Sequence, residues 1–192
     1  MIKLDIPIQE EVVRQLKAGD SVAISGIMLT GRDMAHKYMI EEKPEFLKSY
    51  LKDSVIYHCG PIVKKVDSHY EIVSAGPTTS IREEPYQYDV IKFYQLKGVL
   101  GKGGMKEKTL AACKEFGCVY LHAAGGAAVL LAQKIIEVKD VFMLEEFGVP
   151  EALWVLQVKD FPAIVTMDTH GNSLHENVLK DSLQKLEELL KI

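Results

Sequence analysis

The sequence has little of what marks membrane, secreted or nucleic-acid-binding proteins. It contains no apolar run of roughly 18 residues or more, so no segment is long enough to span a bilayer as a helix. The first residues, MIKLDIPIQEEVV, lack the basic segment, the apolar stretch and the small-residue cleavage site of a secretory signal. A formal net charge of -4 offers no broad positive field for nucleic acid. We therefore expect a cytoplasmic protein that binds neither a membrane nor nucleic acid.

Cysteine is scarce and irregularly spaced. The three cysteines, Cys59, Cys113 and Cys118, make an odd number, which argues against a disulfide framework. The spacing CKEFGC matches neither the C-x2-C of a zinc knuckle nor a ferredoxin-type cluster run. We expect three structural thiols and no metal site in this chain.

The material that is present suits one layered α/β domain spanning residues 1–192. At 47% hydrophobic and 26% charged, the chain has enough apolar residues for one substantial core. Strand-like apolar runs occupy 22–27, 54–59, 70–75, 98–101, 118–123, 153–158 and 163–168. Helical periodicity occupies 10–16, 33–42, 105–117, 125–136 and 175–192, and 43–53 reads as a linking excursion. Interspersed strands and helices predict a sheet with flanking helices.

The last predicted helix, 175–192, is amphipathic. One stripe carries its apolar residues, which are Val178, Leu179, Leu183, Leu186 and Leu190, while acids and lysines occupy the other faces. We expect this helix to dock on its own domain.

Four stretches of polar and conformationally special residues follow predicted strands. They are TGRDMAH (30–36), SAGPTTSIR (74–82), GKGGM (101–105) and DTHGN (168–172). Open α/β sheets expose ligand sites at the carboxyl ends of strands, so this recurrence indicates a binding site.

SAGPTTSIR combines a glycine exit, a proline, three hydroxyls and an arginine. Thr78, Thr79 and Ser80 are placed to cap a following helix or turn, and together with Arg82 they predict a cradle for an anion. The alternative is a well-capped helix with a surface arginine.

TGRDMAH has the same construction. Arg32 offers a planar fork for a carboxylate, and Asp33 is placed to cap the helix that contains His36. Alternatively, Asp33 only caps the helix or pairs with Arg32, and His36 is a satisfied core histidine.

GKGGM carries Lys102 among glycines but lacks the spacing of a nucleotide phosphate loop. In DTHGN, Asp168 and His170 either belong to a site or stabilise the turn. Three cations on glycine-marked loops, Arg32, Arg82 and Lys102, suit a small dicarboxylate. The sequence offers no obvious nucleophile and base pair and no metal-ligand set, so some of the catalytic groups that a reaction needs are missing from this chain.

The motifs together resemble a known family. GDSVAISGIMLTGRDMAH, IYHCGP, SAGPTTSIR, GKGGM, AAGGAAVLLA, PEALWVLQVKDFPAIV and DTHGNSL resemble the β subunit of class I fumarate hydratases and L-tartrate dehydratases, over roughly residues 1–175. The same region forms the C-terminal domain of single-chain iron-sulfur fumarases.

The resemblance implies a swivelling β/β/α fold and an α-subunit partner. In the family, that partner supplies three cysteines to a 4Fe-4S cluster, and the β subunit grips the dicarboxylate. By this resemblance the chain itself binds no cofactor and forms a hetero-oligomer, or a homodimer when isolated.

The resemblance also implies roles for individual residues. Thr78 would abstract the proton, and the ligands of the substrate would be Arg32, Arg82, Lys102 and Thr79. Asp33 and His36 would orient Arg32. Where the family often has methionine after SIR, this chain has Glu83 and Glu84, which could pair with Arg82 or cap the local structure.

The leading hypothesis is therefore reversible hydration of fumarate to malate. Dehydration of L-tartrate is the alternative within the class, and a stand-alone anion-binding module without catalysis is the alternative outside it.

Overall fold

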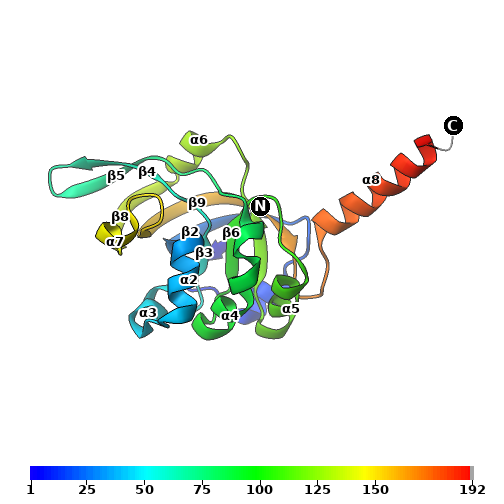
Figure 1. Ribbon diagram of the computed structural model, residues 1–192, viewed down its shortest axis with the longest axis horizontal. Helices are drawn as coiled ribbons and strands as arrows, with labels where there is room; N and C mark the ends of the chain where they lie inside the picture. Colours follow the sequence, from blue (N-terminus) through cyan, green and yellow to red (C-terminus); the bar gives the residue numbers. More distant parts are fainter. Residues whose placement is uncertain (191–192) are drawn as a thin grey trace.

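The computed structural model describes residues 1–190, and a mixed sheet of seven strands forms its centre (Figure 1). The strands of this sheet are β1 (Ile2–Asp5), β2 (Ser21–Thr30), β3 (Val55–Tyr57), β6 (Gly98–Gly101), β7 (Val119–His122), β8 (Ile135–Phe142) and β9 (Leu153–Met167). A separate hairpin is formed by β4 (Ile62–Val66) and β5 (His69–Ser74). The helices are α1 (Glu10–Gln15), α2 (Asp33–Glu41), η1 (Glu45–Leu47), α3 (Lys48–Leu51), η2 (Ser80–Glu83), α4 (Glu84–Tyr94), α5 (Glu107–Phe116), α6 (Ala128–Ala132), α7 (Leu144–Phe147) and α8 (Leu174–Leu190).

The sheet closes on itself through the long strand β9. Strands β1, β2, β3, β6 and β7 pair in parallel, whereas β9 pairs antiparallel with both β7 and β2. The ring is closed and barrel-like, and its five strands are β2, β3, β6, β7 and β9. The register between β2 and β9 shifts at Gly26, where φ is +123° and a Cβ atom would lie 2.8 Å from the Cβ of Ile6. Only glycine fits this bend, which helps the ring to close.

Alternating residues of the central strands fill two cores. In β3, Val55 and Tyr57 point into the core inside the ring, whereas Ile56 points into the core under the helices. Helices α2, α4 and α5 cover that second face together (Figure 1), and contribute Met39, Ile91 and other buried side chains to it. This arrangement confirms the predicted α/β class with flanking helices.

Most predicted elements are found, with informative exceptions. The two runs at 153–158 and 163–168 are halves of one strand, β9, and the helix predicted at 125–136 was wrong in its second half, where β8 begins at Ile135. The run LLAQKII is apolar on both sides of the boundary, so periodicity cannot separate a helix from a strand there. Strands β1, β4 and β8 and helices α4 and α7 were not predicted. The excursion at 43–53 is mostly helical, as η1 and α3.

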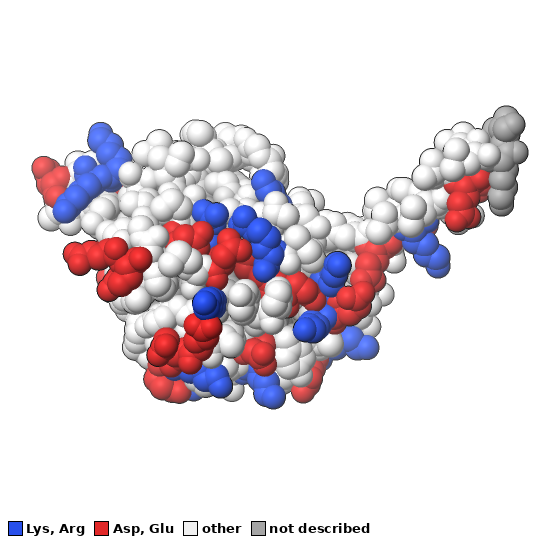
Figure 2. Space-filling view, in the orientation of Figure 1, with Lys and Arg blue, Asp and Glu red and all other residues white. Residues whose placement is uncertain are grey.

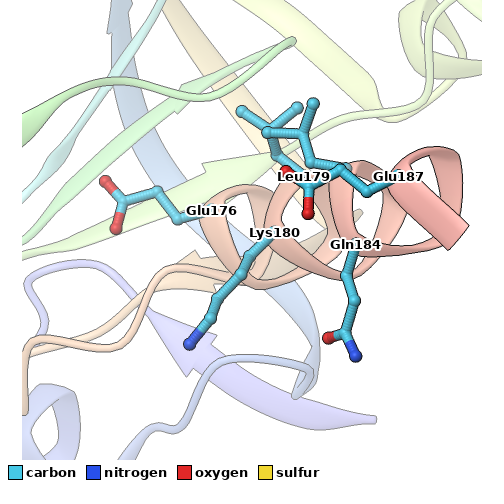
Figure 3. A pocket seen from close by; sticks show the side chains of 6 residues that line it. Glu176, Leu179, Lys180, Gln184 and Glu187 are labelled. Atoms are coloured by element: carbon cyan, nitrogen blue, oxygen red, sulfur yellow. The ribbon is translucent and has the colours of Figure 1, made fainter. Parts of the chain in front are cut away.

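The prediction for the C-terminal helix was wrong in one respect. α8 forms, but it projects from the body (Figure 1) instead of docking on it. Its apolar stripe is open to solvent; Leu183 is 51% exposed and Leu190 is 77% exposed. The hollow in Figure 3 is lined by residues of α8 alone. The last two residues of the predicted helix, 191 and 192, lie outside the described part.

The surface in view carries charges of both signs interspersed (Figure 2). Within residues 1–190, no helix combines the length and the apolarity needed to traverse a membrane.

Candidate functional site

The parallel strands bring two of the predicted loops, those of Arg32 and Lys102, to one edge of the sheet, together with the segment of His58. Arg32 follows β2, His58 follows β3 and Lys102 follows β6, and these strands are parallel neighbours. Their carboxyl ends therefore lie together, as the topology of such sheets requires.

Backbone hydrogen bonds fasten the SAGPTTSIR segment across this edge. The Thr78 N–H donates to the His58 carbonyl at 2.7 Å, and the Lys102 N–H donates to the Thr78 carbonyl at 3.2 Å. The Ser80 N–H then donates to the Lys102 carbonyl at 3.0 Å, and Thr79 bridges to Lys102. Thr78, Thr79 and Lys102 are thus fixed side by side in the backbone.

The hydroxyls of this segment do not cap a helix. Thr79 occupies the N-cap of η2 without a side-chain hydrogen bond, so the capping prediction was wrong. The Thr78 Oγ1 atom is buried and has no hydrogen-bond partner among residues 1–190. Ser80 Oγ instead lies 2.8 Å from His58 Nδ1 and accepts a hydrogen bond from the Tyr120 hydroxyl at 2.9 Å. A buried hydroxyl without a partner costs free energy, which makes Thr78 a candidate for a functional group.

Arg32 and Arg82 each face a carboxylate. The Arg32 Nε atom lies 3.2 Å from the Glu151 carboxylate. Gly60 packs against the same arginine, because a Cβ atom on Gly60 would lie 2.6 Å from Arg32 Nη1. Arg82 Nη2 lies 3.3 Å from Asp33, and both of these side chains are more than two-fifths exposed. Asp33 therefore contacts Arg82 and not Arg32, and it makes no N-cap hydrogen bond for α2.

His36 and Lys102 complete the predicted set. The His36 Nδ1 atom is 2.9 Å from the carbonyl oxygen of Arg32, so this histidine does touch the backbone of Arg32. Burial lowers the pKa of His36 to about 4, which keeps its ring neutral near pH 7. Lys102 is half-buried beside Gly125 and forms no ion pair with the described residues.

Glu84 supports the loop that carries Lys102. Its carboxylate accepts hydrogen bonds from the N–H groups of Lys106, Lys108 and Thr109 and from the Thr109 hydroxyl, at 2.7 to 3.2 Å. It thereby caps the start of α5 from a neighbouring helix, so one of the two acids after SIR does cap the local structure.

Glu83, the other acid, was not predicted as a site residue. It is fully buried, and neither carboxylate oxygen has a hydrogen-bond partner within residues 1–190. Burial, together with the neighbouring charge of Asp33, raises the pKa of Glu83 to about 7, although Arg82 acts in the opposite direction. No sequence pattern distinguishes this buried glutamate from the exposed ones.

Two histidines on the far side of the GKGG loop were also missed. The rings of His122, at the end of β7, and His175, at the start of α8, have centroids 5.6 Å apart. A Cβ atom on Gly104 would lie 2.6 Å from the His175 ring, so the loop packs against that ring. Burial lowers the pKa of both histidines.

DTHGN lies away from this edge, since β9 runs antiparallel to its neighbours. Asp168 accepts hydrogen bonds from the N–H groups of His170, Asn172 and Ala18, and Ala18 precedes β2. Burial alone would raise the pKa of Asp168, but hydrogen bonds from the Asn172 side-chain amide and from these backbone N–H groups outweigh it and lower the pKa. Asp168 therefore stabilises the turn, the second of the two interpretations.

The described residues do not gather a metal-ligand set. No group of three or more His, Cys, Asp or Glu side chains within residues 1–190 is arranged to hold a metal ion. The three cysteines are buried free thiols, and burial raises the pKa of Cys59 to about 12. Such thiols are poor ligands and poor nucleophiles.

Cations and a hydroxyl at the carboxyl edge of a closed sheet suit an anionic ligand. Comparison with known proteins places the chain more narrowly. The family model described as Fumarase C-terminus matches residues 1–178, and the chain belongs to this family.

The relatives differ in length and in name. A protein of Geobacillus stearothermophilus named as a class I fumarate hydratase is 53% identical over 98% of this chain and 36% of its own length. A protein of Methanocaldococcus jannaschii named as an L(+)-tartrate dehydratase subunit beta is 46% identical over 93% of each chain. The L(+)-tartrate dehydratase subunit beta of Escherichia coli K12 is 40% identical over 89% of this chain and 85% of its own. The chain thus spans about a third of the first relative and nearly all of the others.

Proposed function

We propose that this chain is the β subunit of a two-subunit iron-sulfur hydro-lyase that reversibly hydrates fumarate to (S)-malate. The observation that carries the proposal is the buried hydroxyl of Thr78, which lacks a partner among residues 1–190 and is tied by its backbone to Lys102. The whole chain, 1–192, would act as one domain of the swivelling β/β/α type, which the closed sheet with one layer of flanking helices supports.

The cations divide the substrate between them. Arg32, Arg82 and Lys102 bind the two carboxylates, and Thr79 lies beside Lys102 to help position one of them. The ion pair of Arg82 with Asp33 is exposed, and exposed pairs contribute only about 0 to 1 kcal/mol. A substrate carboxylate can therefore displace Asp33 at little cost. The ion pair of Arg32 with Glu151 is mostly buried, so displacing Glu151 costs more free energy than displacing Asp33.

Thr78 takes part in proton transfer at the carbon next to the departing hydroxyl. An alcohol is a weak base near neutral pH, so its alkoxide needs nearby positive charge. Lys102, adjacent in the backbone, can supply that charge. His36 holds the backbone carbonyl of Arg32, which supports its role as an orienting residue.

The cluster would belong to the partner. The donor set of this chain does not fit a 4Fe-4S cluster, since Cys59 is buried in one core, apart from the neighbouring pair Cys113 and Cys118 in the other, and no three ligands gather within residues 1–190. A cluster carried by an α subunit supplies a Lewis acid for the departing hydroxyl. The names of the tartrate dehydratase relatives, which are called β subunits, support a hetero-oligomer.

Anaerobic activity of the assembled pair tests this function. The chain is expressed alone and together with a candidate α subunit, iron and sulfide are reconstituted, and fumarate absorbance is followed from malate. We expect turnover only in the co-expressed sample. A complex that converts tartrate but not malate would establish the tartrate dehydratase named among the relatives. Failure of the two chains to associate would favour the stand-alone anion-binding module.

Arg82→Ala tests the site. Loss of a charge-assisted contact to a carboxylate should lower kcat/KM by about 10²-fold while leaving the fold intact. Arg14→Ala is the matched control, because Arg14 is also exposed and paired with an acid, Glu10, but lies on α1. Equal kinetics of the two variants would remove Arg82 from the site.

A further inference from the structure

A buried chain of polar side chains lies beneath the candidate site. Gln87 on α4 has its amide Oε1 atom 3.2 Å from His36 Nε2 and 2.9 Å from His58 Nε2. The two rings meet edge to face with centroids 4.9 Å apart. Gln87, His36, His58 and Ser80 are all fully buried. Nothing in the proposed reaction yet uses Gln87 or His58.

The two ends of this row of buried side chains reach two different parts of the site. At one end, His36 Nδ1 meets the Arg32 carbonyl at 2.9 Å. At the other end, His58 Nδ1 meets Ser80 Oγ at 2.8 Å, and the His58 carbonyl accepts the Thr78 N–H at 2.7 Å. Among the side-chain hydrogen bonds of residues 1–190, those of Gln87 therefore connect the two histidines.

Close packing around Ser80 restricts the movement of this end of the row of buried side chains. A methyl group on Gly101 would overlap Ser80 Oγ, so the hydroxyl sits directly against the backbone of β6. The Tyr120 hydroxyl donates to the same oxygen at 2.9 Å. A shift of His58 would thus be transmitted to the segment that carries Thr78.

The protons in this row of hydrogen-bonded side chains can be assigned. Burial lowers the pKa of His36 and of His58, so both rings are neutral and each carries one N–H. The Arg32 carbonyl only accepts, so the proton of His36 is on Nδ1 and its Nε2 atom is an acceptor. The Gln87 amide must then present its NH2 group. One NH2 group has two N–H bonds, one for each Nε2 atom, which leaves the His58 proton on Nδ1 to donate to Ser80 Oγ.

The amide oxygen and nitrogen exchange positions when the group turns by 180°. With the oxygen toward the rings, the Gln87 Nε2 atom has no partner among residues 1–190. With the NH2 group toward the rings, each Nε2 atom receives a hydrogen bond, while the amide oxygen and the Ser80 hydroxyl hydrogen are left without a partner among residues 1–190.

We propose that Gln87 and His58 are positioning residues: the His36–Gln87–His58 bridge holds Arg32 and Thr78 at a fixed separation. The substrate spans these two groups in the proposed reaction, so this inference rests on the proposed function. Displacement of a reacting group by about 1 Å can cost about 10²-fold in rate. A neutral, fully buried bridge of hydrogen bonds is a rigid way to prevent such a displacement.

Gln87→Leu and Gln87→Glu test the bridge in the assembled enzyme. Leucine removes both hydrogen bonds, and we expect kcat to fall by roughly 30- to 100-fold, with a smaller rise in KM because Arg82 and Lys102 still bind substrate. Glutamate can keep the bridge only by placing a carboxylate and an imidazolium in a buried position, so it should also lower kcat by at least tenfold. Tyr94→Phe on the same helix is the control. It removes a buried hydroxyl that donates to Met39 at 3.4 Å and should leave kcat unchanged.

Nitrogen NMR of labelled histidine tests the proton assignment without activity. In the unmutated chain we expect two neutral rings protonated at Nδ1. In Gln87→Glu, the carboxylate needs Nε2–H donors, so His36 should become an imidazolium.

The outcomes separate the two proposals. An inactive assembled enzyme that retains the two Nδ1–H rings contradicts the proposed function alone. An active enzyme in which Gln87→Leu stays within twofold of normal kcat overturns the positioning role. Rings protonated at Nε2, or Gln87→Glu with normal kcat, would overturn the assigned bridge.

Discussion

The carboxyl edge of the sheet and the C-terminal helix are incomplete surfaces of opposite kinds. At the edge, the polar atoms of Thr78 and Glu83 are buried without hydrogen-bond partners among residues 1–190. On α8, the apolar side chains of Leu183 and Leu186 are about half exposed. Each arrangement costs free energy, the first through lost hydration of polar groups and the second through hydration of apolar ones.

The two surfaces differ in what supports them. The edge is held by strand ends, by backbone hydrogen bonds across the Thr78 segment and by the buried bridge through Gln87. α8 is attached at its first turn, near His175, and then leaves the body (Figure 1). A costly arrangement that the fold supports from several elements indicates function, whereas an exposed stripe indicates only that something covers it in another state.

Thr78→Val should have the largest effect, and it tests whether the buried edge is functional or structural. Valine keeps the shape but removes a hydroxyl without a partner, so the free energy of unfolding should not fall. Turnover of the assembled enzyme should fall by about 10³-fold, with little change in KM, because a general base contributes that much. Kinetics and urea unfolding on the same samples give both quantities.

A destabilised Thr78→Val variant with nearly normal turnover would reverse the interpretation. The hydroxyl would then be a structural group, and the edge would resemble any other buried part of the fold.

Glu83→Gln should have an intermediate effect, on stability. In the folded chain, burial raises the pKa of Glu83 from 4.5 to about 7, so the native state binds a proton more tightly than the unfolded state. Stability contributed by the protonated form is therefore lost as the pH rises from about 4.5 through 7. By linkage the loss amounts to roughly 3 kcal/mol.

Glutamine does not ionise, so the variant should lack this loss. Its free energy of unfolding, compared with that of the unmutated chain, should improve by that amount between pH 4.5 and pH 8. Glu107→Gln, at an exposed position on α5, serves as the control. Identical pH profiles for the Glu83→Gln variant and the unmutated chain would mean that Glu83 has a partner in solution.

The same contrast explains what sequence could predict. Arg32 and Lys102 could be assigned to one edge, because glycine-rich loops after parallel strands meet there. Thr78 depended on the family resemblance. Gln87 and Glu83 could not be found, since their chemistry comes from burial on helices α4 and η2, and α4 itself was not predicted.

For α8 the sequence predicted the apolar face correctly but not what lies against it. Periodicity reports which side chains share a face, and it holds no information about the surface that covers them. The prediction that Asp33 caps α2 failed for a similar reason. Asp33 has a distant partner, Arg82, that competes for its carboxylate.

The smallest effect is expected for substitutions on α8, and a larger one would show that its apolar stripe is covered by the body. If the stripe does not pack on the body, Leu183→Glu with Leu186→Glu should change the free energy of unfolding of the chain by no more than about 0.5 kcal/mol. Leu121→Ala, in the core inside the ring, is the control and should cost about 2 to 5 kcal/mol. A loss of several kcal/mol in the α8 variant, at a protein concentration that does not alter it, would show that the helix folds back onto its own body in solution. The docking of this helix on its own domain, which the sequence predicts, would then be correct. The projecting helix would be one of two conformations related by a hinge at Leu174.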